Sequence, residues 1–102
     1  MTFFVTSRWG GDKRDVSVEH MREVLEELDL HDNEHCSVSL THESGWSLGV
    51  HESGLLVWEN VEEGEPRHLP VVSREHVLEL WQALARGDLE RVEREPWLPG
   101  YG

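Results

Sequence analysis

The stretch HESGWSLGVHESGLLVWEN, from His42 to Asn60, decides how the chain is expected to fold because it contains the tetrapeptide His-Glu-Ser-Gly twice. Such a repeat predicts either a doubled ligand site, with histidines and glutamates set out for a metal or for catalysis, or one turn used twice. In a common three-residue hairpin loop, a type I turn is closed by a residue in the left-handed region, which is usually glycine. Glu-Ser-Gly fits that loop in both copies. We therefore interpret the repeat as structural.

Two such loops would set the register of three antiparallel strands. Leu40 then faces Leu48 in the first hairpin, and Leu48 faces Trp58 in the second. Apolar side chains alternate with polar ones at a period of two, so this register gathers them on one face of the sheet, and a slip of one residue would mix the two sets. The same register points His42 and His51 to opposite faces, which argues against a metal site shared by the two copies.

The segments around this meander predict the remaining elements. Aromatic and β-branched residues are typical of strands, and apolar residues at spacings of three and four are typical of helices. Helix N-caps are expected at Ser17, Ser73 and Asp88, and a helix stop at Gly87. The expected strands are 2–8, 35–42, 46–51, 55–60 and 67–72, and the expected helices are 18–29, 74–86 and 89–95. The sequence thus predicts one α+β domain over residues 1–102, with an antiparallel meander sheet of about four to five strands and helices packed on one face.

The balance of charge narrows the classes of partner. The chain has 21 acidic and 9 basic residues, a formal net charge of −12. Nucleic acid and anionic lipid surfaces repel such a chain, so we expect neither as a partner. A cationic partner is favoured, although acidity can also serve only to keep a protein in solution. No basic leader precedes the first apolar run and no stretch is long enough to span a membrane, so a cytoplasmic protein is expected.

Motifs for catalysis and cofactor binding are missing from the sequence. It has no glycine-rich phosphate loop, no nucleophile elbow and no metallohydrolase motif, so we expect no catalytic residues and no cofactor. His31 and His35 have the spacing of a zinc pair and Cys36 is adjacent, but the residues between them read as a loop. We predict no dedicated metal site. A small histidine-based metal-binding or sensing module is the alternative.

Acidic clusters and tryptophans are the candidates for partner binding. Carboxylates placed opposite a basic cleft accelerate association, and aromatic side chains dominate the binding energy at the centre of an interface. The candidate residues are Glu19, Glu23, Glu26 and Glu27 on the first helix, Glu59, Glu62, Glu63 and Glu65 in the loop run, and the anchors Trp9, Trp46 and Trp97. For Trp97 the alternative is that the tail folds back and packs this ring as a lid on the core.

The order of these features resembles the immunity proteins of bacterial polymorphic-toxin systems, in particular the first-numbered Imm family. The opening strand runs into RWGG and is followed by the helix VSVEHMREVLEELD. A meander containing WSLGV and LLVWE comes next, and then VSREHVLELWQALARGDLERVEREPW. The resemblance implies a small, non-catalytic α+β protein that binds and neutralises a cognate toxin. We expect the toxin domain to be basic and to act on nucleic acid, and the inhibitor to be a monomer or weak dimer; a non-catalytic regulatory subunit is a further alternative.

Overall fold

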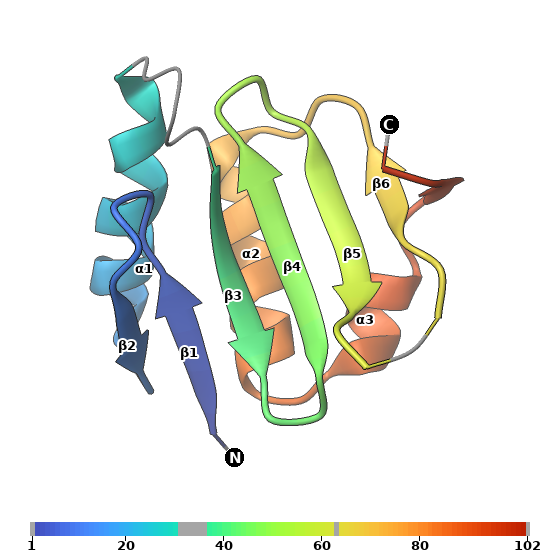
Figure 1. Cartoon of the computed structure of the whole chain (residues 1–102), viewed down its shortest axis with the longest axis horizontal. Coiled ribbons are helices and arrows are strands. Elements are labelled where there is room, and N and C mark those ends of the chain that lie inside the picture. Colours follow the sequence, from blue (N-terminus) through green and yellow to red (C-terminus); the bar gives the residue numbers. More distant parts are fainter. Residues whose placement is uncertain (1, 31–36, 63, 102) are drawn as a thin grey trace.

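Among the described residues, a seven-stranded antiparallel sheet forms one layer and three α-helices lie behind it on one side (Figure 1). The computed structural model describes residues 2–30, 37–62 and 64–101. The strands are β1 (Phe3–Thr6), β2 (Asp12–Arg14), β3 (Ser37–His42), β4 (Trp46–His51), β5 (Leu56–Asn60), β6 (Arg67–Leu69) and β7 (Leu98–Pro99). The helices are α1 (Val18–Glu26), continued by the 3₁₀ turn η1 (Glu27–Asp29), α2 (Arg74–Ala85) and α3 (Leu89–Glu93).

The strand order is β2-β1-β3-β4-β5-β6-β7. Strands β3 to β6 form a meander, β1 joins the free side of β3, and β7 pairs with β6 after α2 and α3. The register predicted for the two central hairpins is confirmed. Leu40 pairs with Leu48, and Leu48 pairs with Trp58. The interpretation of 35–42 as a strand holds over β3, while residues 35 and 36 lie outside the described part of the chain.

The repeated tetrapeptide is a turn, as predicted. In each copy the glycine N–H donates to the histidine carbonyl over 2.9 Å, and the glycine lies in the left-handed region, with φ of 93° at Gly45 and 98° at Gly54. The histidine side chain also takes part. Nδ1 of His42 accepts from the Ser44 N–H at 3.1 Å, and Nδ1 of His51 accepts from the Ser53 N–H at 3.0 Å.

The core lies between the helices and one face of the sheet. Leu40, Leu48 and Trp58 are fully buried on that face and meet Trp81 of α2, whose indole N–H donates to the Leu48 carbonyl over 2.9 Å. Met21, Val24 and Leu25 bury one side of α1 in the same core. This continuous apolar cluster supplies the main driving force for folding, at about 25 cal/mol per Å² of apolar surface buried.

The predicted helix starts and the stop at Gly87 are confirmed, whereas the predicted helix 18–29 is α-helical only to Glu26 and the predicted helix 89–95 ends at Glu93. Ser17 and Ser73 cap α1 and α2 by accepting the backbone N–H three residues on, each at 3.2 Å. Asp88 caps α3 in the same way at 3.3 Å. Gly87 has a φ of 78° and ends α2 where only glycine takes that conformation without strain.

The prediction of four to five strands was too low, because β2 and β7 were not expected. Both are edge strands, one of three charged residues and one of two residues that include a proline. Neither shows the apolar alternation that marks a strand in a sequence. They form because their backbones complete the hydrogen bonding of β1 and β6, which a sequence pattern does not report.

No helix within the described ranges combines the length and the apolar character needed to cross a membrane.

Candidate partner-binding site

Three tryptophans stack at one corner of the molecule. The Trp46 ring lies 4.4 Å from the Trp58 ring at an interplanar angle of 13°, and Trp97 lies 6.2 Å from Trp58 at 17°. Trp58 is fully buried, whereas Trp46 and Trp97 are half-buried at the margin of the core. The tail therefore does fold back onto the core, as the alternative for Trp97 predicted, and part of the ring still reaches the surface.

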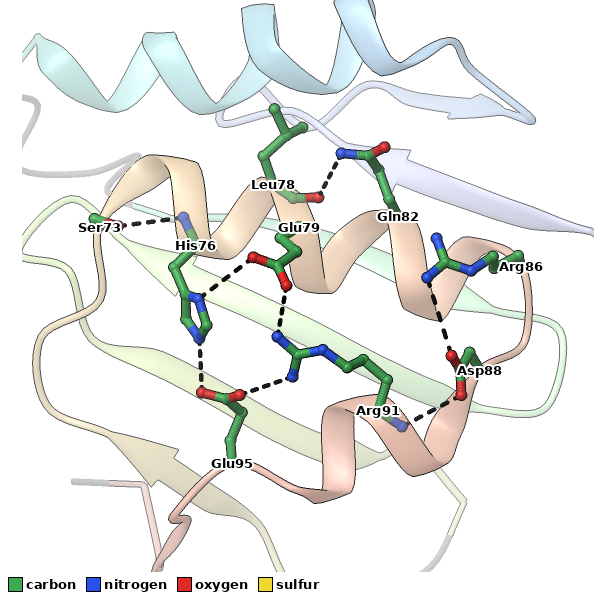
Figure 2. Close-up of polar contacts among 9 residues, drawn as sticks. All are labelled: Ser73, His76, Leu78, Glu79, Gln82, Arg86, Asp88, Arg91 and Glu95. Carbon is green, nitrogen blue, oxygen red and sulfur yellow. Dashed lines mark hydrogen bonds and ion pairs between the residues drawn. The ribbon is translucent and has the colours of Figure 1, made fainter.

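A polar network between α2 and α3 holds the tail in this position (Figure 2). Glu95 bonds to His76 at 2.6 Å and to Arg91 at 2.9 Å, and Arg91 bonds in turn to Glu79 at 2.7 Å. Burial alone would raise the pKa of Glu95, but the bonds from His76 and Arg91 outweigh it, so the pKa is lowered and the carboxylate stays charged. The Glu95 carbonyl then accepts the N–H of Trp97 at 2.8 Å.

A groove of about 410 Å³ opens beside the stacked rings. We call it the tryptophan groove; it is lined by Trp46, Gly64, Glu65, Pro66, Arg67, Trp97 and Pro99. Aromatic rings and prolines form most of its walls, and two side chains of opposite charge stand among them. Such a concave, mainly apolar surface with few polar groups is typical of a binding site.

Arg67 already shows how this groove receives a cation. Its guanidinium lies 5.9 Å from the centre of the Trp46 ring and forms two 2.7 Å bonds to the carboxylate of Glu93. The Arg67 bonds lower the pKa of Glu93, against the opposing effect of burial, and the Trp58 indole N–H adds a further bond at 3.2 Å. The charge of Arg67 is thereby compensated, whereas Glu65, the other charged residue of the groove wall, forms no ion pair with another described residue.

The predicted loop residues divide between two faces of the sheet. Glu65 lines the tryptophan groove and Glu62 is exposed in the same loop. Glu59, by contrast, belongs to β5 and lines a trough on the other side of the sheet together with Tyr101. Hydrogen bonding to Glu59 raises the pKa of the Tyr101 hydroxyl. The prediction for Glu63 falls outside the described residues.

The acidic residues predicted on the first helix lie at the opposite end of the sheet from the groove, because α1 lies beside β1 and β2 whereas the groove forms near β6 and β7 (Figure 1). Glu19, Glu23 and Glu26 are exposed on α1. Glu27 does not belong with them, because it is half-buried and accepts the Arg8 backbone N–H at 3.2 Å. Trp9, the remaining predicted anchor, is 62% exposed with the Arg8 guanidinium 5.5 Å from its ring centre.

Of the eleven predicted binding residues, the structure thus brings Trp46, Trp97 and Glu65 into one groove. The sequence analysis missed Arg67 and its partner Glu93, which lie 26 residues apart and carry no shared motif. It also missed Pro66 and Pro99, which reach the groove from a loop and from β7.

Metal binding finds no support in the described part of the chain, where no group of three or more histidine, cysteine, aspartate or glutamate side chains is placed to hold an ion. The alternative site at His31, His35 and Cys36 falls outside the described residues.

Comparison with known proteins gives no relative. No family model matches the chain, and neither a curated protein nor a solved structure matches it.

Proposed function

We propose that this protein is a cytoplasmic, non-catalytic inhibitor of the immunity-protein type that binds and neutralises a cognate toxin. The observation that carries the proposal is the tryptophan groove, where two half-buried indoles and the exposed Glu65 share one concave surface of a strongly acidic chain. Rigid aromatic anchors beside a carboxylate suit a basic protein surface. The expected partner is a basic toxin domain that acts on nucleic acid.

The groove suggests how such a partner would be held. An arginine or lysine side chain of the toxin enters between Trp46 and Trp97 and pairs with Glu65, in the way that Arg67 lies against Trp46 and pairs with Glu93. A cation over an indole is worth about 0.5–2 kcal/mol, more when water is excluded. Glu62, close by in the same loop, adds to the field that draws the cation in.

The test compares two double variants that each remove two negative charges. Glu62→Gln with Glu65→Gln changes the groove end, and Glu19→Gln with Glu23→Gln changes exposed positions on α1. The partner is the product of the adjacent reading frame, and association is followed by stopped-flow tryptophan fluorescence at low and high salt. We expect the groove variant to associate about three- to tenfold more slowly at low salt, with a flatter salt dependence, and the α1 variant to stay within about twofold of wild type.

Two results would count against the proposal in different ways. Equal slowing by both double variants would show that overall charge, rather than the groove, attracts the partner. If the adjacent gene product neither binds the wild-type protein in size-exclusion chromatography nor loses toxicity on co-expression with it, the inhibitor function itself is wrong. The variant Trp97→Ala, checked for folding by thermal denaturation, tests the aromatic anchor without changing the charge of the groove. It is expected to speed dissociation of the complex.

A further inference from the structure

The face of the sheet opposite the helices is not covered by any described helix (Figure 1). Because the buried strand residues point to the helices, their neighbours in sequence point to this open face. At its centre these neighbours are small: Ser39 and Thr41 on β3, and Ser47 and Gly49 on β4. Of these, Ser39, Ser47 and Gly49 line a trough of about 370 Å³, together with Val57, Glu59 and Tyr101 among others.

One row of side chains crosses the open face from the edge strand β2 to β5. Arg14 of β2 pairs with Phe4 of β1, Phe4 with Thr41, Thr41 with Ser47, and Ser47 with Glu59 of β5. The row therefore begins with the positive charge of Arg14 and ends with the negative charge of Glu59. Between these ends and the centre, the large ring of Phe4 lies on one side and the small hydroxyl group of Ser47 lies on the other. Thr41 is the middle residue of the five.

The open face also differs from the rest of the surface in charge. Along the strands, the described carboxylates and cations that face this way are Asp12, Arg14 and Glu59, in a chain with a formal net charge of −12. Asp12 already accepts the Thr6 hydroxyl at 2.7 Å. Two copies of such an acidic protein repel each other least through this face.

We propose that the open face is the interface of a symmetric homodimer. A two-fold axis between two facing sheets, running close to the direction of β3, reverses the row in the second copy. Arg14 of one copy then meets Glu59 of the other, Phe4 stands over Ser47 and Gly49 in the trough, and Thr41 meets its own counterpart. The contact is self-complementary in size and in charge, as a two-fold interface requires. Sheets packed face to face lie about 10 Å apart with strands about 30° from parallel, which a small tilt of the axis supplies.

This inference does not rest on the proposed function. The tryptophan groove lies on the helix side, since Arg67 pairs with the buried Trp58 and shares its face. The two surfaces are therefore separate, and dimerisation and partner binding can be tested one at a time.

The test is analytical ultracentrifugation of the full chain over a range of concentrations. The wild type is expected to dimerise at micromolar concentration, and Arg14→Glu and Glu59→Arg are each expected to weaken the dimer at least tenfold. Mixing these two variants restores both charge pairs, so the mixture is expected to form a dimer within about threefold of wild-type affinity. The two residues are four strands apart in one chain, roughly 19 Å, so restoration reports contact between copies.

Matched controls come from the same elements. Lys13→Glu makes the same charge change one residue from Arg14 but on the other face of β2, and it is expected to leave the dimer unchanged. Tyr101→Phe removes the hydroxyl group that is bonded to Glu59. This variant shows how much of the effect of Glu59→Arg comes from losing the bond to Tyr101 rather than from reversing the charge. Phe4→Ala removes the ring that would occupy the trough of the second copy, and it is expected to weaken association about tenfold. Circular dichroism checks that this variant is folded.

A wild-type protein that stays monomeric up to about millimolar concentration would overturn the homodimer. So would a dimer that Arg14→Glu and Lys13→Glu weaken equally, because the contact would then not distinguish the two faces. Failure of the mixed variants to associate, when both are folded, rejects the Arg14–Glu59 contact and with it the proposed two-fold axis.

Discussion

The two copies of His-Glu-Ser-Gly have identical sequences and the same turn, yet they meet different surroundings. His42 lies on the helix face and is only 6% exposed, and its Nε2 has no hydrogen-bond partner among the described residues. His51 is half-exposed and lines the trough on the open face. Glu43 stands in solvent, whereas the Glu52 side chain is 14% exposed and lies 3.3 Å from the buried guanidinium of Arg8.

The difference shows which properties of the repeat are local. Backbone conformation and the histidine–serine bond are set by residues within the tetrapeptide, so they recur in both copies. Burial and ion pairing depend on segments that are distant in sequence, such as Arg8, which lies 44 residues from Glu52. Substitutions at matched positions in the two copies can therefore separate local from tertiary contributions to stability.

The largest difference is expected between the two glutamates. Glu52→Gln removes the carboxylate from Arg8, whose side chain is 1% exposed and would keep a buried charge with fewer compensating groups. We expect a loss of about 2–3 kcal/mol in the free energy of unfolding, against a change within about 0.5 kcal/mol for Glu43→Gln. Urea denaturation followed by tryptophan fluorescence measures both. Similar losses would mean that the Arg8 contact contributes little.

A smaller difference is expected between the histidines. His42→Ala removes the bond to Ser44 and also a buried ring opposite Phe3, so we expect a loss of about 2 kcal/mol. His51→Ala removes the equivalent bond from a half-exposed position and should cost about 0.5–1 kcal/mol. Thermal unfolding gives the ranking. A His51 variant as unstable as the His42 variant would contradict the role assigned to burial.

The smallest difference is expected between the glycines. Gly45 and Gly54 both have positive φ, and an alanine in that region costs about 1–2 kcal/mol in either place. A Cβ at Gly45 would lie 2.9 Å from Oδ1 of Asn60, the far end of a side chain that can move, and one at Gly54 would lie 3.4 Å from Val71 and Val72. Chemical denaturation of Gly45→Ala and Gly54→Ala should therefore give losses within about 0.5 kcal/mol of each other. A neutral substitution at either glycine would show that the turn can change type.

Much of the fold could be predicted because its signals are local. The loop length fixes which residues face each other across β3, β4 and β5, and the alternation of apolar residues agrees with that register. The cap residues Ser17 and Ser73 bind backbone groups only three positions away. For such features the residues that interact are also neighbours in sequence.

The candidate site could be predicted only in part. Tryptophans and acidic residues could be named as binding types, and Trp46, Trp97 and Glu65 do share a groove. Nothing local, however, distinguishes Glu65 from Glu27, which Arg8 engages inside the molecule.

By itself, the sequence determined the turns, the register of the central strands, the helix starts and the acidic character of the chain, because each depends on residues a few positions apart or on composition alone. Only the tertiary structure decided which carboxylates face a partner, which are bonded to arginine, and which face of the sheet stays open. These outcomes depend on contacts such as Arg67 with Glu93 and Arg8 with Glu52, between segments that come together only when the apolar core forms. Burial of the apolar core therefore provides the free energy that brings these distant surface groups into their positions.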